Sequence, residues 1–149
     1  MKIWKLLAVV LILSFSITAQ AKKSISENEK RMSKLLLGEW KTVDFTFHPQ
    51  DLVSVSKEMK IIASMMPVYE VRFRPNKKLS IKATQTVNGK DVINQVSLFW
   101  RLENQGDYLI FYKNNKEVEL HKVLLIDDEM METLVESENL QVIYHWERK

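Results

Sequence analysis

The stretch YEVRFRPNKKLSIKATQTVNGKDVINQVSLFWRL, residues 69–102, decides the predicted fold. Apolar and polar residues alternate on both sides of a turn that begins at Pro75, and this period of two is typical of half-buried β-strands. Asn88-Gly89 is the residue pair most typical of a tight β-hairpin. The stretch therefore predicts consecutive antiparallel strands joined by short turns.

The same pattern continues to the end of the chain and also precedes the opening stretch. An alternating run at 41–47 predicts the first strand, and the last one ends at Trp146. Turn signals separate the later strands at 103–107, 114–115, 127–128 and 138–139. Eight strands linked mainly by short turns predict an all-β, antiparallel up-and-down barrel, in which no strand edge is left free. A two-sheet sandwich is the alternative.

Trp40 and Phe45 are large apolar residues of opposite parity in the first predicted strand. Both can face a core only if the strand contains an irregularity, so we expect a bulge or a twist between them. A short helix is predicted before this strand, because Ser26 and Glu29 have the spacing of a capping box. Gly38 is placed to end that helix.

A second helix is predicted at residues 51–66, between the first and second strands. Asp51 is its expected N-cap and Pro67 its stop. The residues expected on its apolar face have helical spacing and are Leu52, Val55, Met59, Ile62 and Met66. The helix is interpreted either as a lid over a cavity mouth or as a cover for one end of the core.

The first residues have the pattern of an export signal. Lys2 and Lys5 precede an apolar run at 6–13 that is too short to span a membrane, and Ala19-Gln20-Ala21 resembles a cleavage site. We therefore predict a signal peptide at residues 1–21 and one domain at residues 22–149. The protein is expected to be periplasmic or secreted, with no transmembrane segment in the mature chain.

Composition excludes several classes of protein and site. The chain has 46% hydrophobic and 28% charged residues, as a single globular domain does. Its formal net charge of +3 includes two signal-peptide lysines, and charges of both signs alternate, which argues against nucleic-acid binding. The absence of Cys removes disulfides, thiol nucleophiles and thiolate metal sites.

No residue pattern predicts catalysis, a metal site or a cofactor. His121 and His145 fall on the polar parity of their strands, so both are predicted to face solvent; the alternative role of a haem or metal ligand lacks a second ligand at a fixed spacing. Glycine-rich phosphate loops and the serine-nucleophile motif are also missing. A basic hairpin is interpreted as a charged outer face or as a site for an anionic partner: Arg72, Arg74, Lys77, Lys78 and Lys82.

The segment Leu36-Leu37-Gly38-Glu39-Trp40-Lys41, which opens the first of eight predicted strands after a short helix, resembles the lipocalin-like (calycin) barrels. It looks most like the small secreted lipocalin-like domains of Bacteroidetes. In that family the Trp packs across the closed end of the barrel, and a basic residue near the last strand lies over it. The resemblance therefore implies structural roles for Gly38, Trp40 and Arg148. The predicted helix at 51–66 and the missing disulfide depart from typical lipocalins.

The resemblance implies a binding protein, and an eight-stranded barrel is either filled by side chains or holds one small ligand. The sequence predicts an exported, non-enzymatic protein that binds a small apolar or amphipathic ligand in its barrel. The alternative is a ligand-free structural or protein-interaction module of the cell envelope. A cavity above ~300 Å³ would favour binding of a ligand, and a fully packed interior would oppose it. The candidate ligand-binding residues are Tyr69, Phe73, Trp100, Tyr108, Tyr112, Tyr144, Met59 and Met66.

Overall fold

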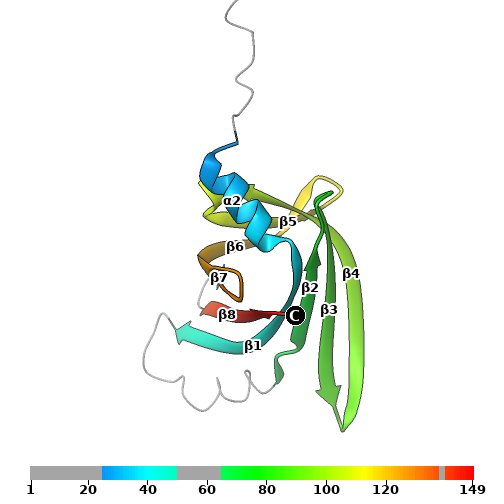
Figure 1. Ribbon diagram of the computed structural model, residues 1–149. Coiled ribbons are helices and arrows are strands. Elements are labelled where there is room, and N and C mark those ends of the chain that lie inside the picture. Colours follow the sequence, from blue (N-terminus) through cyan, green and yellow to red (C-terminus); the bar gives the residue numbers. More distant parts are fainter. Residues whose placement is uncertain (1–24, 50–64, 138–139) are drawn as a thin grey trace, which may run out of the picture.

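A computed structural model describes residues 25–49, 65–137 and 140–149, and its strands form a closed barrel (Figure 1). Each strand pairs antiparallel with the next along the chain, and the last pairs with the first. This confirms the predicted eight-stranded up-and-down barrel and excludes the sandwich. The strands are β1 (Gly38–Pro49), β2 (Val68–Phe73), β3 (Lys78–Val87), β4 (Lys90–Glu103), β5 (Tyr108–Lys113), β6 (Lys116–Ile126), β7 (Met130–Ser137) and β8 (Leu140–Arg148).

Helix α2 (Glu27–Leu36) lies across one end of the barrel, as Figure 1 shows. The hydroxyl of Ser26 accepts a hydrogen bond from the backbone N–H of Glu29 at 3.1 Å, which confirms the predicted N-cap. The helix buries Met32 and Leu36 and contacts η1 (Asn104–Gly106), the short 3₁₀ turn between β4 and β5. The predicted signal peptide at residues 1–21 lies outside the described residues, and so does the predicted helix at 51–66 except for its last two residues.

Strand β1 contains the predicted bulge. Its pairing with β8 shifts register between Thr42 and Asp44, so that Val43 is exposed and the strand changes parity there. Trp40, before the bulge, and Phe45, after it, therefore both face the barrel interior. The bulge allows one strand to contribute large apolar side chains on both sides of the irregularity.

The end of the barrel under α2 is sealed around Trp40. Its side chain is 0% exposed, and its indole N–H donates to the carbonyl of Leu36 at 2.9 Å. The guanidinium of Arg148 lies 4.3 Å from the centre of the Trp40 ring and donates to the carbonyls of Leu37 and Leu35 at 2.7 and 2.6 Å. These bonds satisfy carbonyls at the helix C-terminus, which have no partner within the helix.

Gly38 connects the helix to β1 at a point where the backbone passes close to the side chain of Arg148. Its φ is +119°, a conformation that side chains with a Cβ rarely adopt, and a Cβ there would lie 2.8 Å from a guanidinium nitrogen of Arg148. The core continues beneath the seal with further buried residues of the barrel wall: Phe73, Leu79, Leu98, Trp100, Leu102, Leu109, Met131 and Trp146. In the described part of the chain, no helix has the length and apolar character needed to cross a membrane.

Candidate functional site

A small cavity lies within the barrel, next to this packed end. Its volume is about 50 Å³. Residues from β2, β3, β5, β6 and β8 line it: Tyr69, Val71, Ile81, Phe111, Glu119, His121, Tyr144 and Trp146. The cavity is well below the size that holds a drug-sized ligand, yet the interior is not completely filled.

A buried hydrogen-bonded chain forms one side of the cavity. The Trp146 indole N–H donates to the hydroxyl of Thr133 at 3.0 Å, and that oxygen lies 3.1 Å from Nδ1 of His121. Nε2 of His121 lies 3.2 Å from Oε1 of Glu119, but in a geometry that makes no hydrogen bond. Among the described residues, nothing else bonds to this buried nitrogen. A buried polar atom without a partner is uncommon and points to a site for a polar group.

Tyr69 and Tyr144 also line the cavity. Their ring centroids are 6.1 Å apart, and the Tyr144 ring also lies 5.7 Å from the His121 ring. Burial raises the pKa of both phenols, and the negative charge of Glu119 raises each pKa further. Both hydroxyls therefore stay protonated and can donate a hydrogen bond near neutral pH.

The prediction that His121 faces solvent is wrong. His121 pairs with Leu109 and is only 3% exposed, whereas Val118, Leu120 and Leu124 on the same strand are exposed. Strand β6 therefore turns Glu119 and His121 inward and exposes Val118, Leu120 and Leu124, whereas its later residues Val123 and Ile126 pack against the core. Glu119 and His121 could not be recognised from alternation alone, because the apolar parity of a strand usually faces the core. Thr133 shares the parity of Met131 and Val135, and nothing in its sequence context indicates a polar contact.

Four of the candidate ligand-binding residues lie inside the barrel, but at two levels. Tyr69 and Tyr144 line the cavity. Phe73 and Trp100 belong to the packed core instead, where their rings meet edge to face with centroids 5.6 Å apart. Packing of this kind fills the interior and leaves no space for a ligand beside these two rings.

Tyr108 and Tyr112 were expected to face the interior, and the structure corrects this. Leu109 and Phe111 belong to the core, so the alternate residues of β5 lie on the outer face. Tyr112 stacks there on the ring of Phe99 at 5.6 Å. Met66 is partly buried but does not line the cavity, and Met59 is outside the described residues.

His145 lies on the outer face, but it is partly buried and not freely solvated. Nε2 of its ring lies 2.8 Å from the Thr46 hydroxyl, and Nδ1 lies 3.1 Å from a carboxylate oxygen of Glu132. Hydroxyl, imidazole and carboxylate follow one another as in nucleophile relays. None of these three residues lines the interior cavity or the two outer grooves described next, so the relay has no substrate site there.

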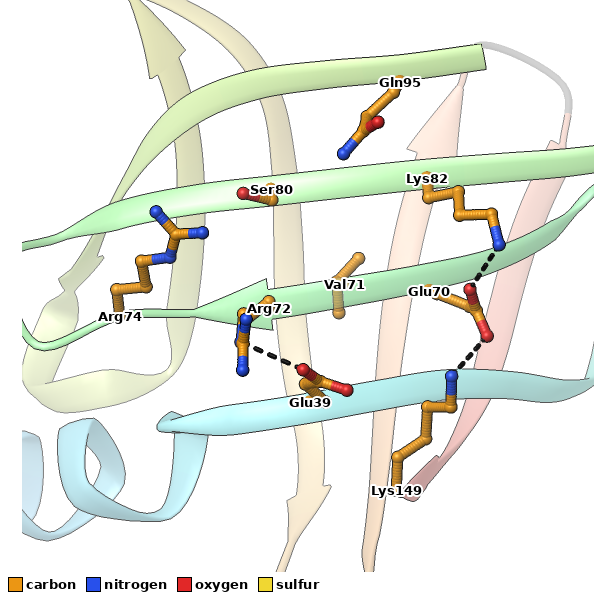
Figure 2. Close-up of a pocket in the computed structure, with 9 residues that line it drawn as sticks. All are labelled: Glu39, Glu70, Val71, Arg72, Arg74, Ser80, Lys82, Gln95 and Lys149. Atoms are coloured by element: carbon orange, nitrogen blue, oxygen red, sulfur yellow. Dashed lines mark hydrogen bonds and ion pairs between the residues drawn. The ribbon is translucent and has the colours of Figure 1, made fainter. Parts of the chain in front are cut away.

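A charged groove of about 190 Å³ lies on the outer face of β1, β2 and β3. Figure 2 shows the side chains that line it. Arg72 pairs with Glu39 at 3.0 Å, and Glu70 accepts from Lys149 at 2.6 Å and from Lys82 at 3.1 Å. Arg72 and Lys82 of the basic hairpin are thus paired within the sheet, although Lys82 shares Glu70 with Lys149. A second outer groove, of about 310 Å³, is lined by residues of β5, β6 and β7 that include Tyr108, Val118, Leu120 and Leu134, and Glu119 borders both this groove and the interior cavity.

We expect the Glu70 cluster to add stability that depends on pH. Hydrogen bonds from Lys149 and then Lys82 lower the pKa of Glu70 to about 2. A carboxylate whose pKa is lowered on folding stabilises the native state above its unfolded pKa, and this contribution is lost as the pH falls toward 2. At pH 7 the free energy of unfolding of the wild-type protein should exceed that of Glu70→Gln by at most about 1 kcal/mol, because these ion pairs lie near the surface.

Urea unfolding of both proteins between pH 7 and pH 2 measures this difference. It should shrink steadily below pH 4.5, the ordinary pKa of the group, and it should also shrink at pH 7 in high salt. A difference that stays constant over the whole pH range would show that the lysines do not stabilise the ionised form.

Metal ligation finds no support in the ranges that the structure describes, where no three His, Asp or Glu side chains are grouped to hold an ion.

No protein-family model and no curated protein matches the chain. Among solved structures, the chain is similar to bovine odorant-binding protein complexed with its natural ligand, with TM-score 0.47 and 11% identity over 77% of this chain and 72% of that one.

Two other solved structures have comparable similarity. The siderocalin Ex-FABP has a TM-score of 0.46 and 13% identity, covering 77% of this chain and 74% of its own. As-p18, an extracellular fatty acid binding protein, has a TM-score of 0.43 and 12% identity, covering 78% of this chain and 97% of its own. At such low scores and identities, these similarities carry no argument about what the chain binds.

Proposed function

We propose that the protein is an exported, lipocalin-like binding protein that takes one end of a small apolar or amphipathic ligand into its barrel. The observation that carries the proposal is the interior cavity beside the sealed end. It combines apolar walls with a few convergent polar groups, which is the usual composition of a small-molecule site. Residues 1–21 are the proposed export signal, and no catalytic role is assigned to the cavity.

The size of the cavity limits what can enter. A cavity of about 50 Å³ has room for roughly three or four water molecules, so only the end of a ligand fits. Ile81 of the cavity wall pairs with Val96 of β4, which has the same inward parity and is 39% exposed. The apolar wall thus continues beyond the cavity, and an alkyl chain can lie along it.

Mass spectrometry under native conditions, on protein purified from its own cells, tests this proposal. We expect a bound small molecule that is lost in Ile81→Phe, because the larger side chain fills the cavity. Val87→Phe is the matched control, since Val87 lies on the same strand but is exposed and away from the cavity. It should keep the bound molecule.

A clean apo mass, together with no thermal shift across a panel of alkyl alcohols, amines and acids, would contradict the proposal. Equal loss of the bound molecule in both variants would place the site elsewhere.

A second candidate function is an envelope-protein interaction through the outer groove of β5, β6 and β7. The specific observation in its favour is the exposed apolar set there, with Val118 57% and Leu120 42% exposed. Such a function predicts the mass of a protein complex in the same spectra. Leu120→Glu should then abolish that mass, whereas Ile81→Phe should leave it unchanged.

A further inference from the structure

The aromatic residues around the cavity suggest which kind of ligand end it accepts, provided that the proposed binding function holds. Four of the lining side chains carry aromatic rings other than imidazole: Tyr69, Phe111, Tyr144 and Trp146. The face of an aromatic ring carries partial negative charge and attracts cations. A small space bounded by several such rings therefore favours a cationic group over an anionic one.

The formal charge at the cavity also favours a cationic group. Glu119 is the acidic residue in the lining, and none of the lining residues is Lys or Arg. Its side chain is 38% exposed, and it borders both this cavity and the outer groove of β5, β6 and β7. The negative charge of Glu119 also reaches both tyrosines, because it contributes to the raised pKa of Tyr69 and of Tyr144.

His121 supplies an additional polar contact that is not used within the protein. The side chain is almost completely buried, its Nδ1 is held by Thr133, and its Nε2 has no hydrogen-bond partner among the described residues. His121 lines the cavity, and its Nε2 lies 3.2 Å from a carboxylate oxygen of Glu119, another lining residue. A polar group placed there can satisfy this nitrogen and pair with the carboxylate at the same time.

We propose that the cavity binds the ammonium head group of an amphipathic amine, held by the carboxylate of Glu119 within the ring of aromatic side chains. A primary ammonium is small enough for the available volume, and its alkyl chain continues along the wall formed by Ile81 and Val96. A ligand carboxylate in the same place would be repelled by Glu119 and would find no cationic side chain in the lining.

Isothermal titration of the purified protein with octylamine, octanol and octanoate at pH 7 tests this inference. The three compounds share one chain length and differ in head-group charge. We expect octylamine to bind at least tenfold more tightly than octanoate, with octanol between them. Octanol reports on the cavity itself, whereas the ratio of amine to acid reports on the head-group preference.

Two variants assign the preference to one carboxylate. Glu119→Gln removes the charge at the cavity, and we expect it to weaken octylamine binding at least fivefold while octanol binding changes less than twofold. Glu117→Gln is the control, because Glu117 is exposed and lies on the outer face of the same strand. It should leave all three affinities unchanged. Thermal unfolding of both variants establishes that they are folded.

The possible outcomes separate the two proposals. If octanol binds but octanoate binds as tightly as octylamine, the ammonium inference is overturned and the cavity function stands. If octylamine binds preferentially but Glu119→Gln and Glu117→Gln weaken it equally, the charge effect is general and the assigned contact is wrong. If none of the three compounds binds, both the cavity function and the ammonium inference are overturned.

Discussion

Trp40→Ala is expected to lower the free energy of unfolding by about 3–5 kcal/mol, the usual cost of truncating a fully buried Trp to Ala. Trp40 is completely buried between α2 and the barrel, and its indole bonds to the Leu36 carbonyl. The substitution leaves a cavity at the sealed end and removes the ring beneath the Arg148 guanidinium. Equilibrium unfolding in urea at pH 7 measures the loss.

Phe99→Ala is the control for loss of aromatic area. Phe99 stacks on Tyr112 on the outer face and is 39% exposed, so its truncation should cost much less than that of Trp40. A loss below about 1 kcal/mol for Trp40→Ala would mean that Trp40 does not act as the buried plug of the barrel end.

Arg148→Lys is expected to cost about 2 kcal/mol although the charge is kept, because hydrogen bonds to charged groups are worth about 1.5–3 kcal/mol each and lysine cannot reproduce them all. The planar guanidinium bonds to the carbonyls of Leu35 and Leu37 while it lies over Trp40. A lysine ammonium can reach one carbonyl but cannot stack in the same way. Unfolding experiments under the same conditions measure this loss.

Arg72→Lys provides the matched control for an arginine replaced outside the seal. Arg72 makes an exposed ion pair with Glu39, and its side chain is 57% exposed, so we expect a change below about 0.5 kcal/mol. Equal losses in the two variants would show that the contacts of Arg148 with the helix C-terminus contribute no special stability.

Most of the fold could be predicted from local sequence patterns. Strand alternation, the Asn88-Gly89 turn and the Ser26 cap correspond directly to β3, β4 and α2. The bulge in β1 could be predicted because Trp40 and Phe45 conflict in parity, and only an extra residue resolves that conflict. Short-range signals of this kind act between neighbours in the chain, so one sequence is enough to recognise them.

The polar half of the candidate site could not be predicted in the same way. Which face of β6 points inward is decided by its pairing with β5, where Leu109 and Phe111 occupy the interior opposite His121 and Glu119. The outer face of these strands has apolar contacts of its own, and outward-facing Ile110 is only 3% exposed. Alternation therefore identified β6 as a strand but assigned the two faces of residues 118–121 in reverse.

One signal in the sequence could have warned of this reversal. Residues 108–113 are apolar on both faces, so the strand paired with them can place its own apolar residues on either side. Where both faces of a strand are apolar, the orientation of its neighbour depends on the register and bulges of the whole barrel. The register shift between Phe111 and Tyr112 is one such irregularity.

The most direct test of the central claim is a nuclear Overhauser experiment between octanol and the assigned tyrosine ring protons of the protein. We expect magnetisation transfer from the alkyl chain to Tyr69 and Tyr144, which line the interior cavity, and none to Tyr108, which lines the outer groove. Transfer to Tyr108 alone, or no transfer at millimolar octanol, would contradict a ligand site inside the barrel.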